Sequence, residues 1–311
     1  MERLATAETL GGQAASAEGR LSRNPWQVRG KGRNLLGRSR GVWAVSVFAY
    51  LFTFVVLFPL LWIVLLSFES NSRILSDPFG LGHLSLQNYQ TVLRTLNLLI
   101  MYKNTFILAV SSVILEVVVT FALSFALSRM AFRRRWIRSA LRYFVFAGLA
   151  VPVYVLLFPV YKLDLMFHVF GTYLALILPY VAGSVPFNTL LFTGFMADFP
   201  VEVEEAAIVD GCSLSLLCRR ITFPMLKPVV TTVVVFNILY IWNEFPFAVT
   251  LINKSSLTTV ALGVSQFQGM WLVDYGAMMA AAVMVLVPQL VLYVVFQRRI
   301  VEGMTLGAVK G

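Results

Sequence analysis

The chain has 311 residues, of which 59% are hydrophobic and only 13% are charged, and its mean hydropathy is +0.79. Water-soluble domains carry about 25% charged residues, so this chain has too few charges to cover the surface of an ordinary cytosolic enzyme. Lys and Arg outnumber Asp and Glu by 25 to 15, which gives a net charge of +10. Two cysteines and two histidines are too few for a metal cluster or a disulfide framework. These values indicate a membrane protein, and we expect no metal site.

Charge-poor stretches show where the chain crosses a membrane, because a bilayer core about 30 Å thick requires roughly 20 apolar residues in a helix. A β-barrel is excluded, since its strands would appear as alternating segments of about 10 residues. Two of the stretches each hold one acidic residue, Glu116 and Glu244. The sequence predicts an all-α membrane protein with six transmembrane helices, at about residues 42–67, 104–128, 143–161, 171–194, 228–252 and 276–297.

The distribution of basic residues predicts the orientation of these helices, because cytoplasmic loops of membrane proteins are enriched in Lys and Arg. With the N-terminus in the cytoplasm, 20 of the 25 basic residues lie in the inner segments 1–40, 129–142, 195–227 and 298–311. We therefore predict that both termini are cytoplasmic, and we attribute the positive charge to topology rather than to nucleic-acid binding. Residues 1–41 lack apolar periodicity, so we expect a mostly disordered basic tail. The long apolar stretch after this tail argues against a cleavable signal peptide.

One inner segment, residues 195–227, is neither short nor uniformly basic: it begins with acidic residues and ends with basic ones. The pattern predicts two short helices, the first capped by Asp198 and ended by Gly211, the second capped by Ser213 and ending before Pro224. Such a pair is suited to docking into a groove of another protein. The alternative, two helices lying on lipid, is disfavoured because an anionic inner leaflet would repel the acidic residues.

The same segment contains a spaced set of residues: Glu205, Ala206, Ala207, Gly211, Ile221 and Pro224. This spacing resembles the EAA loop of ABC-importer permeases, although the family pattern has Leu at the position of Phe223. The C-terminal sequence MTLGAVKG and the segments 242–245 and 274–276 resemble the carbohydrate-uptake branch of that family. Segment 124–129 is similar to the family's motif at the end of the second helix, and the resemblance covers roughly residues 42–311.

The resemblance implies a fold and a set of partners. Permeases of this family have the type I ABC-importer fold and pair with a second permease subunit, usually as a heterodimer. They dock on two ATPase subunits, and an extracytoplasmic solute-binding protein delivers the solute. The implied location is the bacterial cytoplasmic (inner) membrane, where the chain is in contact with lipid.

The chain itself lacks the phosphate loop GxxxxGK followed by Ser or Thr, so a partner must hydrolyse ATP. We expect no catalytic residue and no bound cofactor here, with ATP and Mg on the partner ATPase subunits. We call residues 195–227 the coupling loop. Ala206 and Ala207 permit close approach of a partner, and Glu205 offers a carboxylate to a basic partner residue. Gly211 gives the turn conformational freedom or simply ends a helix. The residues that the resemblance assigns to ATPase coupling are Glu205, Ala206, Ala207, Asp210, Gly211, Ile221 and Pro224.

Polar residues inside the predicted spans are candidates for the solute pathway, because an ionisable residue in a bilayer normally indicates a cavity or a partner. Asn237, Tyr240 and Glu244 lie on one helix face, and aromatic and carboxylate groups suit a hydroxyl-rich sugar. The alternative for this face is hydrogen bonding between helices. Glu116 can be pore-facing, protonated and packed, or paired with the sister subunit, and Ser184 and Asn188 are weaker candidates. The candidate pathway residues are Asn237, Tyr240, Trp242, Asn243, Glu244 and Glu116.

From these observations we predict the permease subunit of an ATP-driven importer that moves a sugar, oligosaccharide or polyol by alternating access. Another solute, such as a glycerol phosphate or an amino acid, is the first alternative, but a phosphate would favour cationic residues and the spans contain no Lys or Arg. A stand-alone secondary transporter would not need the EAA-like loop. An intramembrane enzyme would need a catalytic set, and the spans hold no His or Cys and only two separated carboxylates.

Overall fold

A computed structural model describes residues 35–80, 82, 84–269 and 273–308. Within these ranges the secondary structure is helical, apart from an isolated antiparallel bridge between Gln268 and Val273. The chain divides into two compact units, residues 1–59 and 60–311. The predicted tail, residues 1–41, lies outside the described residues except for its last seven, which begin helix α2.

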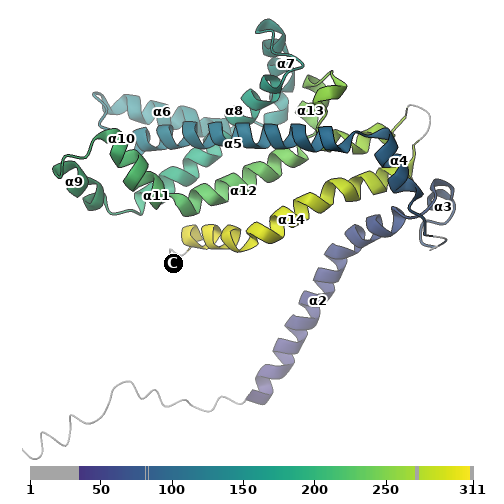
Figure 1. Ribbon diagram of the computed structural model, residues 1–311. Coiled ribbons are helices and arrows are strands. Elements are labelled where there is room, and N and C mark those ends of the chain that lie inside the picture. Colours follow the sequence, from purple (N-terminus) through teal and green to yellow (C-terminus); the bar gives the residue numbers. More distant parts are fainter. Residues whose placement is uncertain (1–34, 81, 83, 270–272, 309–311) are drawn as a thin grey trace, which may run out of the picture. The chain divides into compact units, whose positions relative to one another are not determined.

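Four helices of the described chain are long and apolar enough to cross a membrane. They are α2 (Leu35–Leu66), α5 (Leu98–Arg129), α8 (Tyr173–Ala197) and α14 (Tyr275–Ala308) (Figure 1). Two further pairs of shorter helices pass the same test together, each with a sharp bend: Arg135–Ala150 with Val153–Met166, and Leu214–Met225 with Lys227–Asn243. By length and composition, the number of spans is up to six if each bent pair is one span. The prediction of an all-α membrane protein is confirmed.

The third predicted span is not one straight helix. Helix α6 (Arg135–Ala147) begins inside the basic segment that we had predicted as a loop, and a 3₁₀ turn, η1 (Gly148–Ala150), continues it. After Pro152, η2 (Val153–Leu156) and α7 (Leu157–Met166) run in a direction bent by 95°. The break occurs there because a residue that precedes proline avoids the α conformation.

The fifth predicted span is also divided. Helix α12 (Lys227–Asn243) ends before Glu244, and α13 (Pro246–Leu251) follows after a two-residue break. The break is local, because Pro246 has no N–H to donate and is suited to the first turn of a new helix. Three 3₁₀ turns, η4 (Ser255–Leu257), η5 (Val260–Leu262) and η6 (Val264–Phe267), then lead towards α14.

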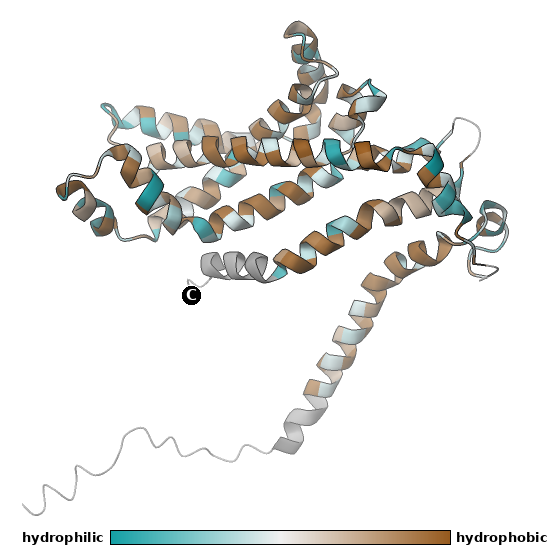
Figure 2. Ribbon diagram, viewed as in Figure 1, coloured by the Kyte–Doolittle hydropathy of each residue, from teal (hydrophilic) through white to brown (hydrophobic). Residues whose placement is uncertain are grey.

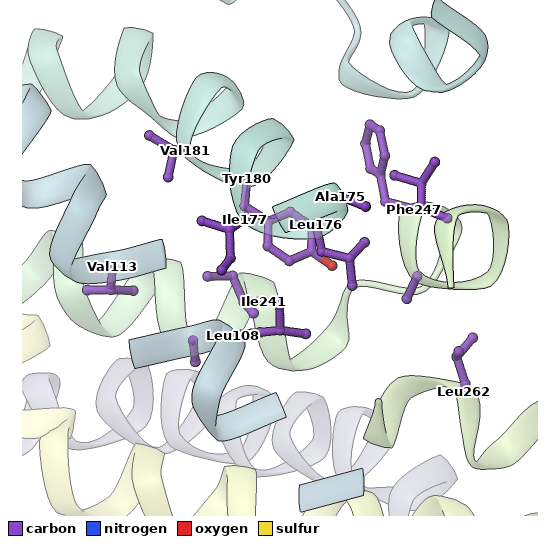
Figure 3. Close-up of a cluster of buried hydrophobic side chains, with 13 residues drawn as sticks. Leu108, Val113, Ala175, Leu176, Ile177, Tyr180, Val181, Ile241, Phe247 and Leu262 are labelled. Atoms are coloured by element: carbon purple, nitrogen blue, oxygen red, sulfur yellow. The ribbon is translucent and has the colours of Figure 1, made fainter. Parts of the chain in front are cut away.

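The second unit is built around α5, α8 and α12, which pack against one another, with α14 against α12 (Figure 1). Their largest apolar cluster extends into α13 and η5, and Figure 3 shows its side chains converging from these elements. The labelled members are Leu108, Val113, Ala175, Leu176, Ile177, Tyr180, Val181, Ile241, Phe247 and Leu262. This cluster holds the helices that carry the candidate pathway residues.

Helix α5 buries polar side chains and exposes apolar ones, which is the reverse of the distribution in a helix of a soluble protein. Polar residues at four-residue spacing are buried along it: Ser112, Glu116, Thr120 and Ser124. Large apolar side chains such as Phe106, Ile114 and Val118 are 59–65% exposed on its other side. Figure 2 shows apolar colouring along most of the length of α5 and α14. An apolar exterior around a partly polar interior is the arrangement expected for helices in lipid or against a partner subunit.

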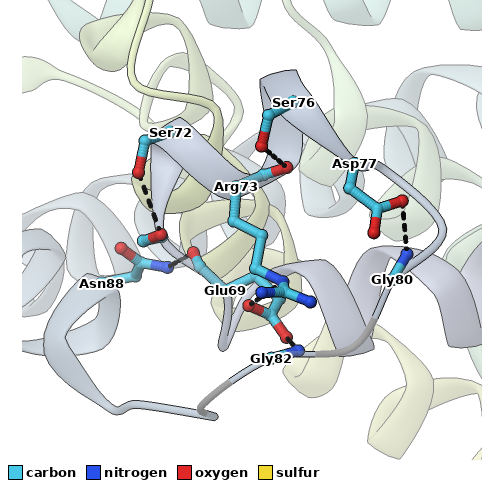
Figure 4. Close-up of polar contacts among 9 residues, drawn as sticks. Glu69, Ser72, Arg73, Ser76, Asp77, Gly80, Gly82 and Asn88 are labelled. Carbon is cyan, nitrogen blue, oxygen red and sulfur yellow. Dashed lines mark hydrogen bonds and ion pairs between the residues drawn. The ribbon is translucent and has the colours of Figure 1, made fainter.

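The end of the bundle opposite α9 (Val201–Val209) is closed by α3 (Asn71–Ser76) and α4 (Gln87–Thr95) (Figure 1). Here the buried Glu69 accepts a hydrogen bond from the backbone N–H of Gly82 at 2.5 Å and lies 3.9 Å from the guanidinium of Arg73 (Figure 4). Asn88 donates to the carbonyls of Ser67 and Glu69 at 2.9 and 2.7 Å. A small polar core therefore holds this segment together.

Residues 274–276, which the sequence analysis singled out, contact this polar core. The backbone N–H of Tyr275 donates to the side chain of Asn71 at 2.8 Å, which joins the start of α14 to α3. A Cβ atom on Gly276 would lie 2.7 Å from the side-chain nitrogen of Asn88, so only glycine permits this approach. The segment has a packing role at this end of the bundle.

Candidate functional site

The predicted coupling segment folds as a helical hairpin at one end of the bundle, between α8 and α12 (Figure 1). Its first helix, α9, has Pro200 at the N-cap position and Glu202 and Glu204 in the first turn. Asp198 lies instead at the C-terminal end of α8, so it does not occupy the predicted cap position. Carboxylates in the first turn are stabilised by the positive end of the helix dipole.

Gly211 ends α9, as we predicted, and it adopts the left-handed conformation, with φ +80°. Its N–H donates to the carbonyl of Ile208 at 3.0 Å, and the N–H of Cys212 donates to that of Ala207 at 2.9 Å. These two bonds form a Schellman motif, which satisfies the last carbonyls of the helix. No atom lies within 4 Å of the position that a Cβ would take, so backbone conformation rather than crowding requires glycine here.

The second helix of the hairpin differs from the prediction. It begins at Leu214 after Ser213, but it passes through a π-helical turn, η3 (Cys218–Thr222), and continues through Pro224 to Met225. The predicted stop before Pro224 was wrong: Pro224 lies in the first turn of α11 (Phe223–Met225), the α-helical turn that follows η3, and proline is tolerated there. A bend of 74° at Leu226 separates this helix from α12.

Six of the seven residues assigned to ATPase coupling fall into two groups, and the seventh, Pro224, is half-buried in the last helical turn of the hairpin. Glu205, Ala206, Asp210 and Gly211 are exposed on the hairpin. Ala207 and Ile221 instead pack against a buried cluster formed by the ends of α5, α8 and α12. Val209 is 86% exposed, so the free surface of α9 combines carboxylates with an apolar side chain. Its carboxylates can pair with basic groups of a protein partner, and its apolar side chain can be buried against that partner.

A buried ion pair that the sequence did not reveal fixes α9 to the spans. Glu204 is 5% exposed, and its Oε2 lies 2.6 Å from Nε of Arg129, the last residue of α5. Thr222 donates to Oε1 of Glu204 at 3.0 Å, and Arg129 Nη2 donates to the carbonyl of Met196 at 2.8 Å. Burial, together with the carboxylate of Glu204, raises the pKa of the Cys218 thiol, so this cysteine stays protonated.

A pocket of about 320 Å³ lies between α8 and α12. It brings the predicted Asn237 and Tyr240 together with Ser184 and Asn188, the weaker candidates from α8. Asn188 Nδ2 and Asn237 Nδ2 are buried, and neither has a hydrogen-bond partner among the described residues. The remaining lining is Val153, Pro179, Tyr180, Gly183, Phe187 and Phe236, which adds aromatic surface without a formal charge.

Glu244 lies outside this lining, and its contacts favour the interhelical alternative. It is 2% exposed and accepts hydrogen bonds from the Tyr180 hydroxyl at 2.7 Å and from the N–H groups of Phe247 and Ala248 at 2.8 and 3.0 Å. The carboxylate thus caps α13 and ties it to α8.

Trp242 and Asn243 also lie apart from Asn237 and Tyr240. Trp242 donates to the carbonyl of Val285 at 3.2 Å and stacks on Tyr102, with 6.0 Å between the ring centroids. Asn243 donates to the carbonyl of Leu239 at 2.7 Å. Both border a different pocket, of about 230 Å³, towards α14.

Glu116 is 1% exposed on the inner face of α5, beside Ser184 of the pocket lining. Its Oε2 has no hydrogen-bond partner among the described residues. Glu116 therefore lies behind the pocket rather than in its lining.

Comparisons with known proteins agree with this architecture. Residues 118–305 match the family described as "Binding-protein-dependent transport system inner membrane component". The diacetylchitobiose uptake system permease protein NgcG of Streptomyces coelicolor is 32% identical over 260 residues, which is 83% of this chain and 85% of that protein. The trehalose/maltose transport system permease protein MalG of Thermococcus litoralis is 29% identical over 278 residues, 85% of this chain and 95% of that protein.

A solved structure has the same fold. A chain of a bacterial ABC transporter involved in the import of the acidic polysaccharide alginate superposes with a TM-score of 0.71 at 17% identity, covering 86% of this chain and 98% of that one. At this identity the likeness concerns the fold alone, which is that of an ABC-importer permease. The chain therefore belongs to the family of binding-protein-dependent transport system inner membrane components: it is a permease subunit of a bacterial ABC importer, served by a binding protein and by ATPase subunits that hydrolyse the ATP.

Proposed function

We propose that this chain forms part of the pathway of an importer for a sugar or oligosaccharide, with the pocket between α8 and α12 as its contribution. In this proposal a second permease subunit completes the pathway. The exposed surface of α9 docks on one of two ATPase subunits, which hold ATP and Mg. The observation that carries the proposal is the joining of Asn237, Tyr240, Ser184 and Asn188 in one pocket.

The chemistry of this pocket suits an uncharged, hydroxyl-rich solute. Amide and hydroxyl groups replace the hydrogen bonds that a sugar loses with its water, and aromatic faces cover its apolar ring surface. A phosphate-bearing solute would favour basic residues, and the lining contains none. Relatives of similar length carry names that specify diacetylchitobiose or trehalose and maltose, which supports the sugar class.

The connectivity explains how ATPase movement reaches this pocket. Helix α8 runs directly into the coupling hairpin, and the hairpin runs directly into α12. The two helices that enclose the pocket are therefore the two that the hairpin joins. A movement of the docked hairpin changes their relative position, so ATP binding can favour one opening of the pathway only by stabilising one arrangement of α8 and α12.

The test is uptake by the complete importer in proteoliposomes. The panel comprises radiolabelled maltose, trehalose and N,N′-diacetylchitobiose, with glycerol 3-phosphate and methionine as solutes of the alternative classes. We expect ATP-dependent uptake of at least one sugar, and binding-protein stimulation of ATP hydrolysis with the same sugar. Uptake of only glycerol 3-phosphate or methionine would reject the sugar proposal.

A further inference from the structure

Adjacent glutamates of α9 have opposite surroundings. Glu205 is exposed, whereas the Glu204 carboxylate is buried between the last residue of α5 and the π-helical turn η3. Successive residues of a helix point about 100° apart, so one carboxylate can face a partner while its neighbour faces the spans. Glu204 is therefore unavailable for docking and must have another role.

The buried group connects four elements through side chains. Arg129 of α5 reaches Glu204 of α9 and the carbonyl of Met196 in α8, and Thr222 of η3 reaches the second oxygen of the same carboxylate. The side chains of Arg129 and Glu204 are only 13% and 7% exposed. The Arg129–Glu204 contact is an ion pair, and the bonds of Arg129 to the Met196 carbonyl and of Thr222 to Glu204 are charge-assisted hydrogen bonds, which are stronger than neutral ones when they are shielded from water. Arg129, Glu204 and Thr222, which we call the clamp, thus resist rotation of α9 relative to the ends of α5 and α8.

We infer that Glu204 and Thr222 are positioning residues of the transport cycle, which transmit movement of α9 into α5 and α8 through Arg129. The inference rests on the proposed function, in which α9 docks on an ATPase subunit. Apart from the clamp, α9 is joined to α8 through the backbone at residues 198–200 and through apolar contacts such as that of Ala207. Without the clamp, a moving partner would turn α9 on this connection instead of moving the spans.

The experiment uses the complete importer in liposomes and measures basal ATP hydrolysis and its stimulation by the binding protein. The binding protein is loaded with maltose or with N,N′-diacetylchitobiose, whichever stimulates the unaltered complex. Stimulation has to pass from the outer face through the spans to the ATPase, so it reports transmission. Recovery of the ATPase with the permease and the KM for ATP report docking.

The matched pair of variants is Thr222→Val and Thr222→Ser, because the two differ in the hydroxyl that reaches Glu204. We expect Thr222→Ser to behave as the unaltered complex. In Thr222→Val, the stimulation of ATP hydrolysis by the binding protein should fall by about 5-fold or more, which is in the usual range of coupling between sites. Glu204→Gln should lose more, because it leaves the Arg129 charge without its counter-ion. In all three variants, ATPase recovery and the KM for ATP should stay within about twofold of their values in the unaltered complex. Thr231→Val in α12 is the control and should have no effect, because its hydroxyl donates to the carbonyl of Lys227 in the same helix and lies outside both the clamp and the docking surface.

Full stimulation in assembled Thr222→Val and Glu204→Gln complexes would overturn the inference. A proportional loss of ATPase recovery and stimulation in Thr222→Val would also overturn it, because that result indicates a merely structural contact. A complex with unaltered sequence that neither sugar stimulates would instead contradict the proposed function, so the two failures are distinguishable.

Discussion

Gly211 illustrates how one backbone conformation can determine a residue. A non-glycine residue at φ +80° costs about 1–2 kcal/mol, and the Schellman bonds of Gly211 and Cys212 hold the chain in that conformation. The surrounding space is open, so a larger side chain would not clash within this chain. It would instead project from the hairpin towards whatever docks there.

We predict that Gly211→Asp abolishes uptake while leaving membrane insertion unchanged, because the spans are unaltered. Gly211→Ala should show a smaller loss, since it has the conformational cost but little added bulk. Gly194→Ala in α8 is the matched control, because its Cβ would meet no atom within 4 Å and Gly194 is helical without a positive φ. Uptake assays with quantified membrane abundance measure these effects. Normal uptake by Gly211→Asp would remove the coupling assignment of this turn.

Substitutions at Glu244 and Asn237 should have different effects, the first on stability and the second on transport. Glu244→Ala leaves the Tyr180 hydroxyl and two N–H donors buried without an acceptor, and each costs about 1–3 kcal/mol. We therefore predict a lower unfolding temperature and reduced abundance for Glu244→Ala. Asn237→Ala should keep the unfolding temperature, because its amide nitrogen is buried without an internal partner. It should lower sugar uptake, because Asn237 lines the pocket. Thermal unfolding in detergent measures the difference, and a stable Glu244→Ala protein with impaired uptake would restore Glu244 to the pathway.

At the scale of elements, α9 is short and has an exposed acidic and apolar surface. An isolated helix of this length is unstable in water, so its structure depends on contacts with the spans. The clamp and the buried cluster around Leu217 and Leu226 provide those contacts. The outer surface of α9 is consequently free to bind a partner.

We predict that Glu205→Lys weakens association with the ATPase, because it inverts one charge on that surface. A loss of about 2–5 kcal/mol is typical when one member of a buried charge pair at an interface is removed. Asp77→Lys, an exposed reversal at the other end of the bundle, is the control and should leave association unchanged. Co-purification of the ATPase with each variant is the measurement. Equal recovery with both variants would contradict the docking role of Glu205.

At the scale of the molecule, the predicted topology is testable without knowledge of the solute. The chain has free cysteines at Cys212 and Cys218, so labelling requires their replacement by serine. In that background, an impermeant thiol reagent applied from outside should label a cysteine introduced at His83 or Lys254. It should not reach a cysteine introduced at Gly32 or Gly307. Labelling at either position would show that the predicted orientation is wrong.

The N-terminal extension gives a further prediction. Because residues 1–34 lack apolar patterning in the sequence, we expect that deleting residues 2–34 leaves assembly and uptake largely intact. Co-purification of the importer subunits and sugar uptake by the truncated protein are the measurements. Loss of the complex would show that the extension binds a partner.

The sequence by itself determined the class of the protein, most of its helices and the place of the coupling hairpin. These features depend on local composition: apolar stretches of bilayer length, a glycine that ends a short helix and the spacing of Glu205 to Pro224 are visible within one segment. The broken spans were not predicted. Pro152 and Pro246 mark the two breaks, but Pro59, Pro179, Pro186 and Pro288 lie inside unbroken helices, so a proline alone does not show where a span divides.

Only the tertiary structure decided which polar residues meet. Membrane helices are apolar on most sides, so their sequence has little periodicity to show which face is inside. Asn237 and Tyr240 therefore could not be separated from Glu244 on the same predicted face, although the first two line the pocket and the third caps α13. The buried role of Glu204 was hidden for a related reason: its partner Arg129 is 75 residues away in the chain, and only packing brings the two charges together.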